Sequence, residues 1–149
     1  MKKLGMAEIA KINRPKLGRQ VPLEVFRMLR LVGIRGGLPM GGKSITATVG
    51  REIGKNLGCN SLEELLQLLQ TYRIGIPSIL ERSDNHLLIA LDDCLVCKGM
   101  DNIGEKVCDL EGAIIEGALT AIIGKTVRVT EIKCNCNGDE ACVYEVRIY

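Results

Sequence analysis

Apolar residues in the first half of the chain recur three and four positions apart, the spacing of one buried helix face. This spacing predicts helices over residues 22–35, over roughly 43–57, and over a segment that begins at Ser61. Pro22 is a favourable first helical residue, and Gly36 follows the first helix as a stop signal. Ser61 and Glu64 form a capping box, which makes the third helix the best defined of the three.

The second half changes to strand-like alternation, interrupted by one further helical stretch. PSILERSDNHLLIALDDC predicts two strands around a turn at 83–85, and EKVCDLEGAIIEGALTAIIG predicts a helix before Gly124. TVRVTEIKC and ACVYEVRIY alternate strictly, and NGD at 137–139 is expected to join them as a hairpin. The order predicts a single α+β domain over residues 1–149, with about four helices on a four-stranded antiparallel sheet.

The amino-acid composition argues against several functional classes. The chain of 149 residues is 46% hydrophobic but only 3% aromatic, so its core is aliphatic and offers few rings for base stacking. A net charge of +2 also argues against nucleic acid as a partner. No apolar run approaches the ~18 residues of a membrane span, so we expect a cytoplasmic protein without membrane insertion. A small aliphatic domain gains by pairing, which favours a homodimer.

One segment matches a phosphate-loop pattern. GLPMGGKS, from Gly37 to Ser44, has the spacing G-x-x-x-x-G-K-[ST], and LLIALDD ends in Asp92 and Asp93 like a metal-holding strand. A phosphate loop must follow a buried parallel strand and open a helix, whereas a helix is predicted before this segment. We therefore expect a connection between helices with a solvated Lys43, and a phosphate-loop nucleotide-binding protein remains an alternative.

Seven cysteines indicate metal binding or redox chemistry more strongly than disulfide stapling, because their number is odd and no secretion signal is visible. In the C-terminal third, Glu131 and Cys134 end one predicted strand, and Cys142 begins its partner. Cys108 lies near the start of the preceding helix. Three thiolates and one carboxylate form a tetrahedral set suited to structural Zn²⁺. Residues three apart on a regular strand face opposite ways, so Glu131 and Cys134 share a metal only if the strand bends or bulges.

The spacing leaves several alternatives open. A polar hairpin tip with inert thiols fits it as well as a metal site does, and Cys136 is an extra thiol that competes with Cys134 as a ligand. Cys94 and Cys97 are read as the end of a strand, with side chains on opposite faces, so packing is favoured over a redox pair. His86, the one histidine, is expected at a surface turn rather than as a haem ligand.

These C-terminal motifs resemble the vinyl-4-reductase domain, which is also described as a predicted hydrocarbon-binding domain. The resemblance is carried by CDLEGAIIEGAL and by VTEIKCNCNGDEACVYEV, in which a glutamate and a cysteine precede a Gly-Asp turn. A cysteine and an aromatic residue two positions later, Cys142 and Tyr144, complete the motif. LGRQVPLEVFRMLR and VGREIGKNLG resemble the family's N-terminal helices more weakly.

The resemblance implies a fold shared with vesicle-tethering subunits and haem-based nitric-oxide sensors, and a pocket for a small apolar molecule. It implies zinc on Cys108, Glu131, Cys134 and Cys142, the ligand positions of the family's phenol-sensing regulators. Those regulators carry an attached ATPase and a DNA-binding part, which these 149 residues do not include. The sequence thus predicts a zinc-stabilised sensor or carrier of a small hydrophobic ligand. Helix and strand facing suggests these lining residues: Phe26, Leu29, Leu66, Leu88 and Ile114.

The family name offers a rival interpretation, in which the chain is a reductase acting on a vinyl group. The sequence shows no flavin or nicotinamide motif, and no pattern in it places a general acid. An enzymatic role is therefore less favoured than ligand binding.

Overall fold

The computed structural model describes residues 1–11 and 13–149. The helices are α1 (Met6–Ile9), α2 (Leu23–Arg27), α3 (Lys43–Lys55), α4 (Leu62–Thr71) and α5 (Asp109–Ile123). The strands are β1 (Ile76–Arg82), β2 (His86–Asp92), β3 (Val127–Lys133) and β4 (Cys142–Ile148). The shorter or wider helical turns are η1 (Met28–Arg35), η2 (Pro39–Gly42) and η3 (Asn135–Asn137).

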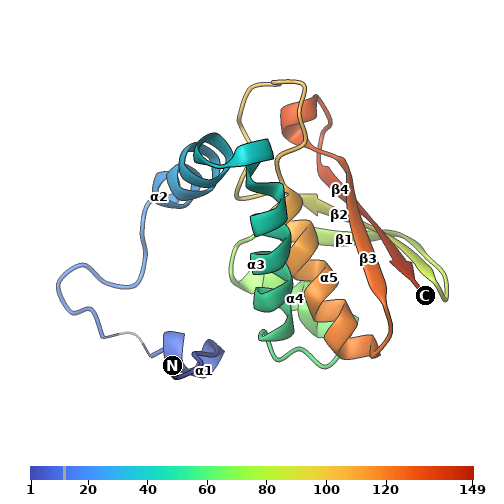
Figure 1. Cartoon of the computed structure of the whole chain (residues 1–149), viewed down its shortest axis with the longest axis horizontal. Coiled ribbons are helices and arrows are strands. Elements are labelled where there is room, and N and C mark those ends of the chain that lie inside the picture. Colours follow the sequence, from blue (N-terminus) through green and yellow to red (C-terminus); the bar gives the residue numbers. More distant parts are fainter. Residues whose placement is uncertain (12) are drawn as a thin grey trace.

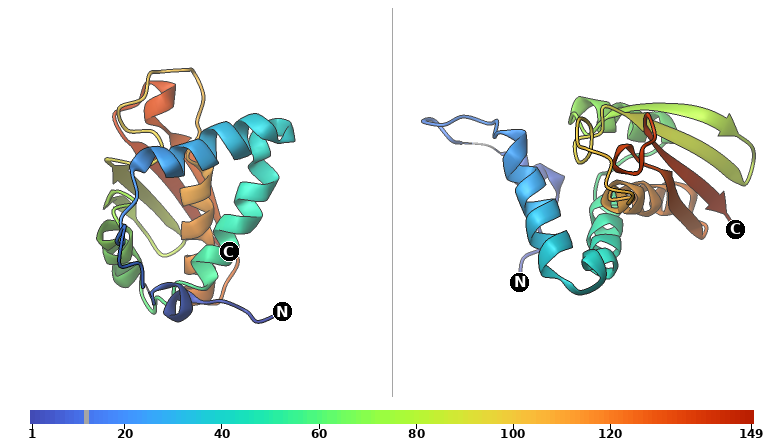
Figure 2. Two further views of the ribbon diagram at one scale, coloured as in Figure 1. Left: turned by 90° about the vertical axis from the view of Figure 1, so that its left-hand side faces the viewer. Right: turned by 90° about the horizontal axis from the view of Figure 1, so that it is seen from above.

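The four strands form one sheet in the order β1-β2-β4-β3, and every neighbouring pair is antiparallel. α5 packs against β3 and α4 packs against β1, so these two helices share one face of the sheet. α3 lies alongside α5 (Figure 1), and α2 with η1 runs beside the body of the domain (Figure 2). The predicted α+β fold, with two hairpins and helices on an antiparallel sheet, is confirmed.

Local chemistry explains why α4 begins where it does. The Glu64 N–H donates to the hydroxyl oxygen of Ser61 at 3.1 Å, and the Glu64 carboxylate accepts from the Asn60 N–H at 2.8 Å. The predicted apolar stripe faces inward, since Leu62, Leu65 and Leu69 are buried. Ser61 therefore caps a helix whose buried face secures one side of the sheet.

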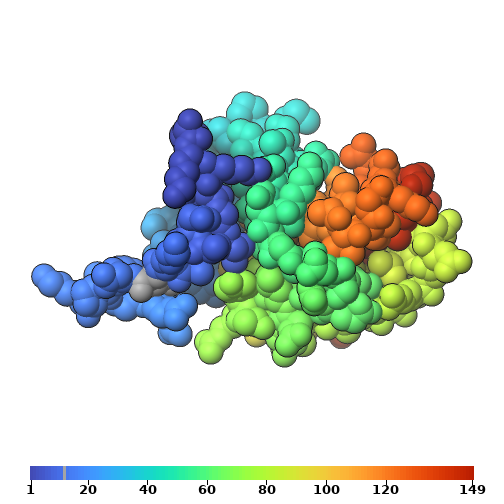
Figure 3. Space-filling model, turned by 90° about the horizontal axis from the view of Figure 1, so that it is seen from below, coloured from blue at the N-terminus to red at the C-terminus, as the bar shows by residue number. Residues whose placement is uncertain are grey.

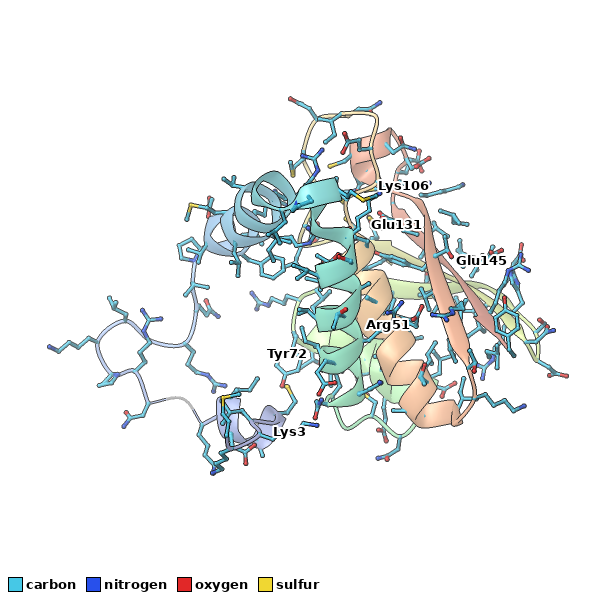
Figure 4. All side chains as sticks on the ribbon, in the orientation of Figure 1. Lys3, Arg51, Tyr72, Lys106, Glu131 and Glu145 are labelled. Atoms are coloured by element: carbon cyan, nitrogen blue, oxygen red, sulfur yellow. The ribbon has the colours of Figure 1, made fainter. Side chains whose placement is uncertain are left out.

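Close backbone contact holds α3 against α5. A methyl group added to Gly54 would lie 2.1 Å from the carbonyl oxygen of Ile114, and one added to Gly117 would lie 2.1 Å from that of Arg51. The Arg51 side chain spans the same seam and donates to Glu116 at 2.5 Å (Figure 4). Glycine is required at this crossing because no larger residue lets the two backbones approach so closely.

The structure corrects two local predictions. The helix expected over residues 22–35 is present, but it widens to π-type turns from Met28 to Arg35. The second hairpin is not closed by a short turn at 137–139. Its strands are joined by residues 134–141, which include η3 and the left-handed Gly138. The start of the chain lies against α3, where Lys3 contacts Glu52 at 3.4 Å, and a later part of the N-terminal segment projects from the body of the domain (Figure 3).

The glycine-rich segment connects two helical elements, as expected. η1 precedes it, α3 follows it, and Met40, Gly41 and Gly42 are all left-handed with φ near 53–67°. Lys43 is exposed. Asp92 ends β2, whose two neighbours are both antiparallel, so the strand order of a phosphate-loop protein is not found among the described residues.

Within residues 1–11 and 13–149, none of the helices combines the length and the apolar character needed to cross a membrane.

Candidate metal centre

Three chain segments meet at one end of the sheet. They are the loop that follows β2, the start of α5, and the connection between β3 and β4 (Figure 1). Together they bury six of the seven cysteines, and only Cys59 lies outside this region.

The four predicted metal ligands lie together in the structure. The ligand atoms of Cys108, Glu131, Cys134 and Cys142 are all within 4.8 Å of one another. The three thiols are fully buried and Glu131 is half-buried. The structure includes Cys134 in this group and not Cys136.

A β-bulge makes the group possible. β3 is in register with β4 up to Glu131, which pairs with Tyr144, and resumes with Lys133 opposite Val143. Ile132 is therefore an extra residue, and the shift turns the following Cys134 toward the face that Glu131 occupies. The expectation that the strand must bulge between these two residues is confirmed.

The predicted orientation of Cys94 and Cys97 was wrong, although both side chains are buried in the core as expected for packing residues. Their sulfurs do not face opposite ways, because both belong to a second group of ligand atoms within 4.8 Å, together with Cys108 and Cys142. β2 ends at Asp92, and Asp93 adopts a left-handed conformation with φ 51°. The two cysteines then lie on a turn, closed by the Lys98 N–H donating to the Cys94 carbonyl at 3.0 Å.

In the sequence, the residue that could have predicted this turn is Asp93. Aspartate tolerates the left-handed conformation better than most residues, and it directly precedes the CLVC motif. A strand that stops at such a residue no longer places the next side chains on alternate faces. Residues three apart on a helical turn share one side, which puts Cys94 and Cys97 next to each other.

Three distances between sulfurs in the cluster can be compared with those around a tetrahedral ion, and the one within the predicted set joins Cys108 and Cys134. Sγ of Cys108 lies 3.8 Å from that of Cys134 and 3.6 Å from that of Cys94, and Sγ of Cys97 lies 3.3 Å from that of Cys142. With Zn–S bonds of about 2.3 Å, tetrahedral geometry places neighbouring sulfurs about 3.8 Å apart. The donor set therefore fits zinc in both chemistry and size.

Hydrogen bonds from surrounding groups orient the donors. The Tyr144 hydroxyl donates to the Cys108 carbonyl at 2.8 Å, and the Cys108 N–H donates to the Glu131 carboxylate at 3.1 Å. The Cys134 N–H donates to Asp139 at 2.9 Å. The ring of Tyr144 lies 3.0 Å from where a methyl group on Gly112 would stand. These contacts explain why an aromatic residue, a Gly-Asp turn and a helical glycine accompany the cysteines.

Electrostatics in the cluster favour a bound cation. Burial, reinforced by the neighbouring Cys134, raises the pKa of Glu131 to about 9. Hydrogen bonding with Cys108 lowers the pKa of Cys134 to about 6. Burial disfavours the charged carboxylate of Glu131, and a divalent ion bound between these donors would stabilise their charged forms.

Cys136 and His86, the other two residues considered as possible ligands, belong to neither group of ligand atoms. Burial raises the pKa of Cys136 to about 12, and its sulfur belongs to neither group of ligand atoms. His86 begins β2 and contacts the Glu145 carboxylate at 3.1 Å, and Glu145 lies on the side of the sheet away from the helices (Figure 4). His86 was expected in a surface turn, and it lies instead on the first residue of the strand after that turn, where it is half-buried.

A cavity of about 590 Å³ lies beside the cysteine cluster, between the start of α2, the end of α4 and the turn after β2. Cys94 contributes to its wall, so the cavity and the cluster are adjacent. Its apolar lining residues are Val21, Pro22, Leu23, Phe26 and Leu95. Its polar lining residues are Gln20, Arg27, Tyr72, Arg73, Asp93 and Lys98.

The five residues proposed from the sequence to line a ligand pocket do not lie in one cavity. Phe26 lines the cavity described above, whereas Leu29 is 62% exposed. Leu66 is half-buried against the core and Ile114 is buried in α5. Leu88 pairs with Glu145, on the side of the sheet that the helices leave uncovered. Of the five, only Phe26 remains a candidate for this cavity.

The fold and the site define an α+β domain with a buried, cysteine-rich centre at one end of an antiparallel sheet and, next to it, a cavity with both apolar and polar lining residues. Residues 87–148 match the model of the vinyl-4-reductase (V-4-R) domain, a match that spans all of β2, α5, β3 and β4 except His86. The chain is 30% identical over 138 residues to uncharacterized protein MJ0150 of Methanocaldococcus jannaschii, covering 89% of this chain and 79% of that protein. The chain belongs to the vinyl-4-reductase domain family.

Solved structures share the fold. A vinyl-4-reductase family protein from Methanocaldococcus jannaschii superposes with a TM-score of 0.67 at 22% identity, over 90% of this chain and 85% of that one. A trafficking protein particle complex subunit 3 from Naegleria fowleri, covalently bound to palmitic acid, gives 0.66 at 13% identity over 85% and 95%. The phenol-responsive sensory domain of the transcription activator PoxR, with phenol, gives 0.58 at 17% identity over 85% and 72%.

These findings confirm the predicted family and the likeness to a vesicle-tethering subunit. The family match and the likeness to a sensory domain fit a ligand-binding domain, and the cysteine cluster has the composition of a metal site.

Proposed function

We propose that this chain is a single domain that binds a small apolar molecule and is stabilised by zinc on Cys108, Glu131, Cys134 and Cys142. The observation that carries the ligand-binding role is the apolar cavity whose wall includes Cys94 of the cysteine cluster. A volume of about 590 Å³ lies within the usual range for small-molecule sites, which are mostly apolar with a few polar groups. Phenol in one structural neighbour and palmitic acid in another support an apolar ligand.

The zinc would join elements that are distant in sequence. Cys108 begins α5, Glu131 and Cys134 flank the bulge of β3, and Cys142 begins β4. With four protein ligands no position stays open for substrate, so we assign the ion a structural role. Cys94, which lines the cavity, lies 3.6 Å from the sulfur of the proposed ligand Cys108, so the ion would support this wall of the cavity indirectly, through Cys108.

Placing a charge in the cavity should weaken ligand binding. Leu23→Asp puts a carboxylate on the apolar wall, where an apolar ligand cannot solvate it. We expect the affinity for the uncharged fluorophore N-phenyl-1-naphthylamine to fall at least about tenfold, the equivalent of ~1.4 kcal/mol, in a fluorescence titration. Leu80→Asp is the matched control, because Leu80 is comparably exposed on β1 and does not line the cavity. An equal loss of affinity in both variants, or no loss in Leu23→Asp, would show that this cavity is not the binding site.

We also propose that the domain is a homodimer. One side of α2 and η1 presents Val25, Met28, Leu29 and Val32 to solvent, with exposed fractions from 47% to 71%. This helix stands beside the body of the domain, where a second copy could reach it (Figure 2). An exposed apolar face of this kind is typical of a surface that pairs.

The oligomeric state tests this directly. At concentrations on the order of tens of micromolar, light scattering should give about twice the chain mass of 16.3 kDa for the wild type. Val32→Glu should give the single-chain mass, because two carboxylates would be buried at the interface. Thr48→Glu, at an exposed polar position on α3, should remain dimeric. A wild-type mass of one chain would contradict the proposal.

A further inference from the structure

The cysteine cluster contains more donors than one metal ion needs. Two groups of four ligand atoms are present, Cys94-Cys97-Cys108-Cys142 and Cys108-Glu131-Cys134-Cys142, and each lies within 4.8 Å throughout. The groups share Cys108 and Cys142. Geometrically they are two tetrahedra with one common edge, and all five thiols are fully buried.

Three sulfur–sulfur distances within the two groups can be compared with the edge of a metal-thiolate tetrahedron. In the first, Cys94 lies 3.6 Å from Cys108 and Cys97 lies 3.3 Å from Cys142. In the second, Cys134 lies 3.8 Å from Cys108. The two distances from Cys108 are close to the ~3.8 Å edge expected around an ion with ~2.3 Å bonds to sulfur, and the 3.3 Å pair of Cys97 and Cys142 would have to open by about 0.5 Å on coordination.

We propose that this cluster binds two divalent, thiophilic metal ions, such as zinc, with the thiolates of Cys108 and Cys142 bridging between them. Cys94 and Cys97 complete the first coordination shell, and Glu131 and Cys134 complete the second. This inference rests on the proposed zinc site and adds to it a second ion, held by the CLVC turn.

Two divalent ions would leave less uncompensated charge on the six ligating side chains than one ion would. Five thiolates and one carboxylate carry a formal charge of −6, which one divalent ion reduces to −4 and two reduce to −2. Such excess charge is costly where the five thiols are fully buried. In the one-ion alternative, Cys94 and Cys97 stay protonated, as neutral thiols hydrogen-bonded to Cys108 and Cys142.

The turn that carries Cys94 and Cys97 is held from both sides, so these thiols are already in position. The Leu95 N–H donates to the Ile74 carbonyl at 2.9 Å, and Arg27 donates to the carbonyls of Leu95 and Lys98, each at 2.8 Å. A preorganised thiol pair loses little conformational freedom when it coordinates an ion.

Metal stoichiometry decides between one ion and two. The wild type, purified without chelators and freed of loose metal by gel filtration, should carry about two zinc ions per chain by native mass spectrometry and elemental analysis. Cys97→Ser should carry about one, since it removes a ligand of the first shell only. Cys136→Ser is the matched control, because Cys136 is equally buried but belongs to neither group, and it should keep both ions.

The outcomes separate this inference from the proposed function. One zinc ion in both the wild type and Cys97→Ser would overturn the second site and leave the single site intact. No bound metal in the wild type would overturn both. If Cys97→Ser does not fold, zinc titration of metal-depleted wild type still decides, since saturation at one equivalent contradicts the proposal.

Discussion

Cys142→Ser is expected to release the bound metal and to lower the melting temperature by about 6–12 °C or more. Structural zinc binding is worth ~10–16 kcal/mol in small zinc domains, and losing only ~3 kcal/mol of it shifts the melting temperature that far at this chain length. Cys142 is shared by both groups of ligand atoms, so its loss affects whatever metal the cluster holds. Elemental analysis and thermal unfolding of the same preparations measure the two effects together.

Two matched variants make this result interpretable. Cys59→Ser should leave both the metal content and the melting temperature unchanged, because Cys59 lies outside the cluster. Glu131→Gln should weaken metal retention less than Cys142→Ser does, since a neutral oxygen replaces the carboxylate while the thiolates remain. Loss of metal should also follow acidification, because protons compete for the same ligands. If metal-free wild type melts at the same temperature as metal-bound wild type, the metal has no structural role.

Gly117→Ala is expected to destabilise the fold by at least about 3 kcal/mol, the upper end of what overpacking usually costs. The new methyl group would lie 2.1 Å from the Arg51 carbonyl oxygen and 2.7 Å from the Arg51 Cα, both of them backbone atoms that cannot rotate away. α3 and α5 would have to separate along the seam that Gly54 also forms from the other side. Chemical denaturation gives the change in the free energy of unfolding.

Gly37→Ala is the control for this crossing. Gly37 has no atom within 4 Å of the added methyl position and no positive φ, so the change in the free energy of unfolding should stay within about 0.5 kcal/mol. A loss of less than ~1 kcal/mol in Gly117→Ala, below the usual cost of overpacking, would mean that the two helices are not packed as tightly as the structure has them.

The sequence by itself determined the element types and their order. Alternation and helical spacing report directly on which side chains face the core, so the two hairpins and the helix between them were predictable from local pattern alone. The C-terminal motif likewise indicated Glu131, Cys134 and Cys142, because the hairpin pairing brings the ends of β3 and β4 together. The motif also indicated a bulge in this strand, because residues three apart on a regular strand, such as Glu131 and Cys134, point to opposite faces.

The tertiary structure alone decided features that depend on contacts between distant segments. Whether Cys94 and Cys97 join the cluster depends on a single left-handed residue, Asp93, and on how the turn after β2 packs against the start of α5. The cavity depends on where α2 lies relative to that turn, and helical periodicity gives the inward face of a helix but not its position in space. For that reason Phe26 lines the cavity while Leu88 lies on the uncovered face of the sheet.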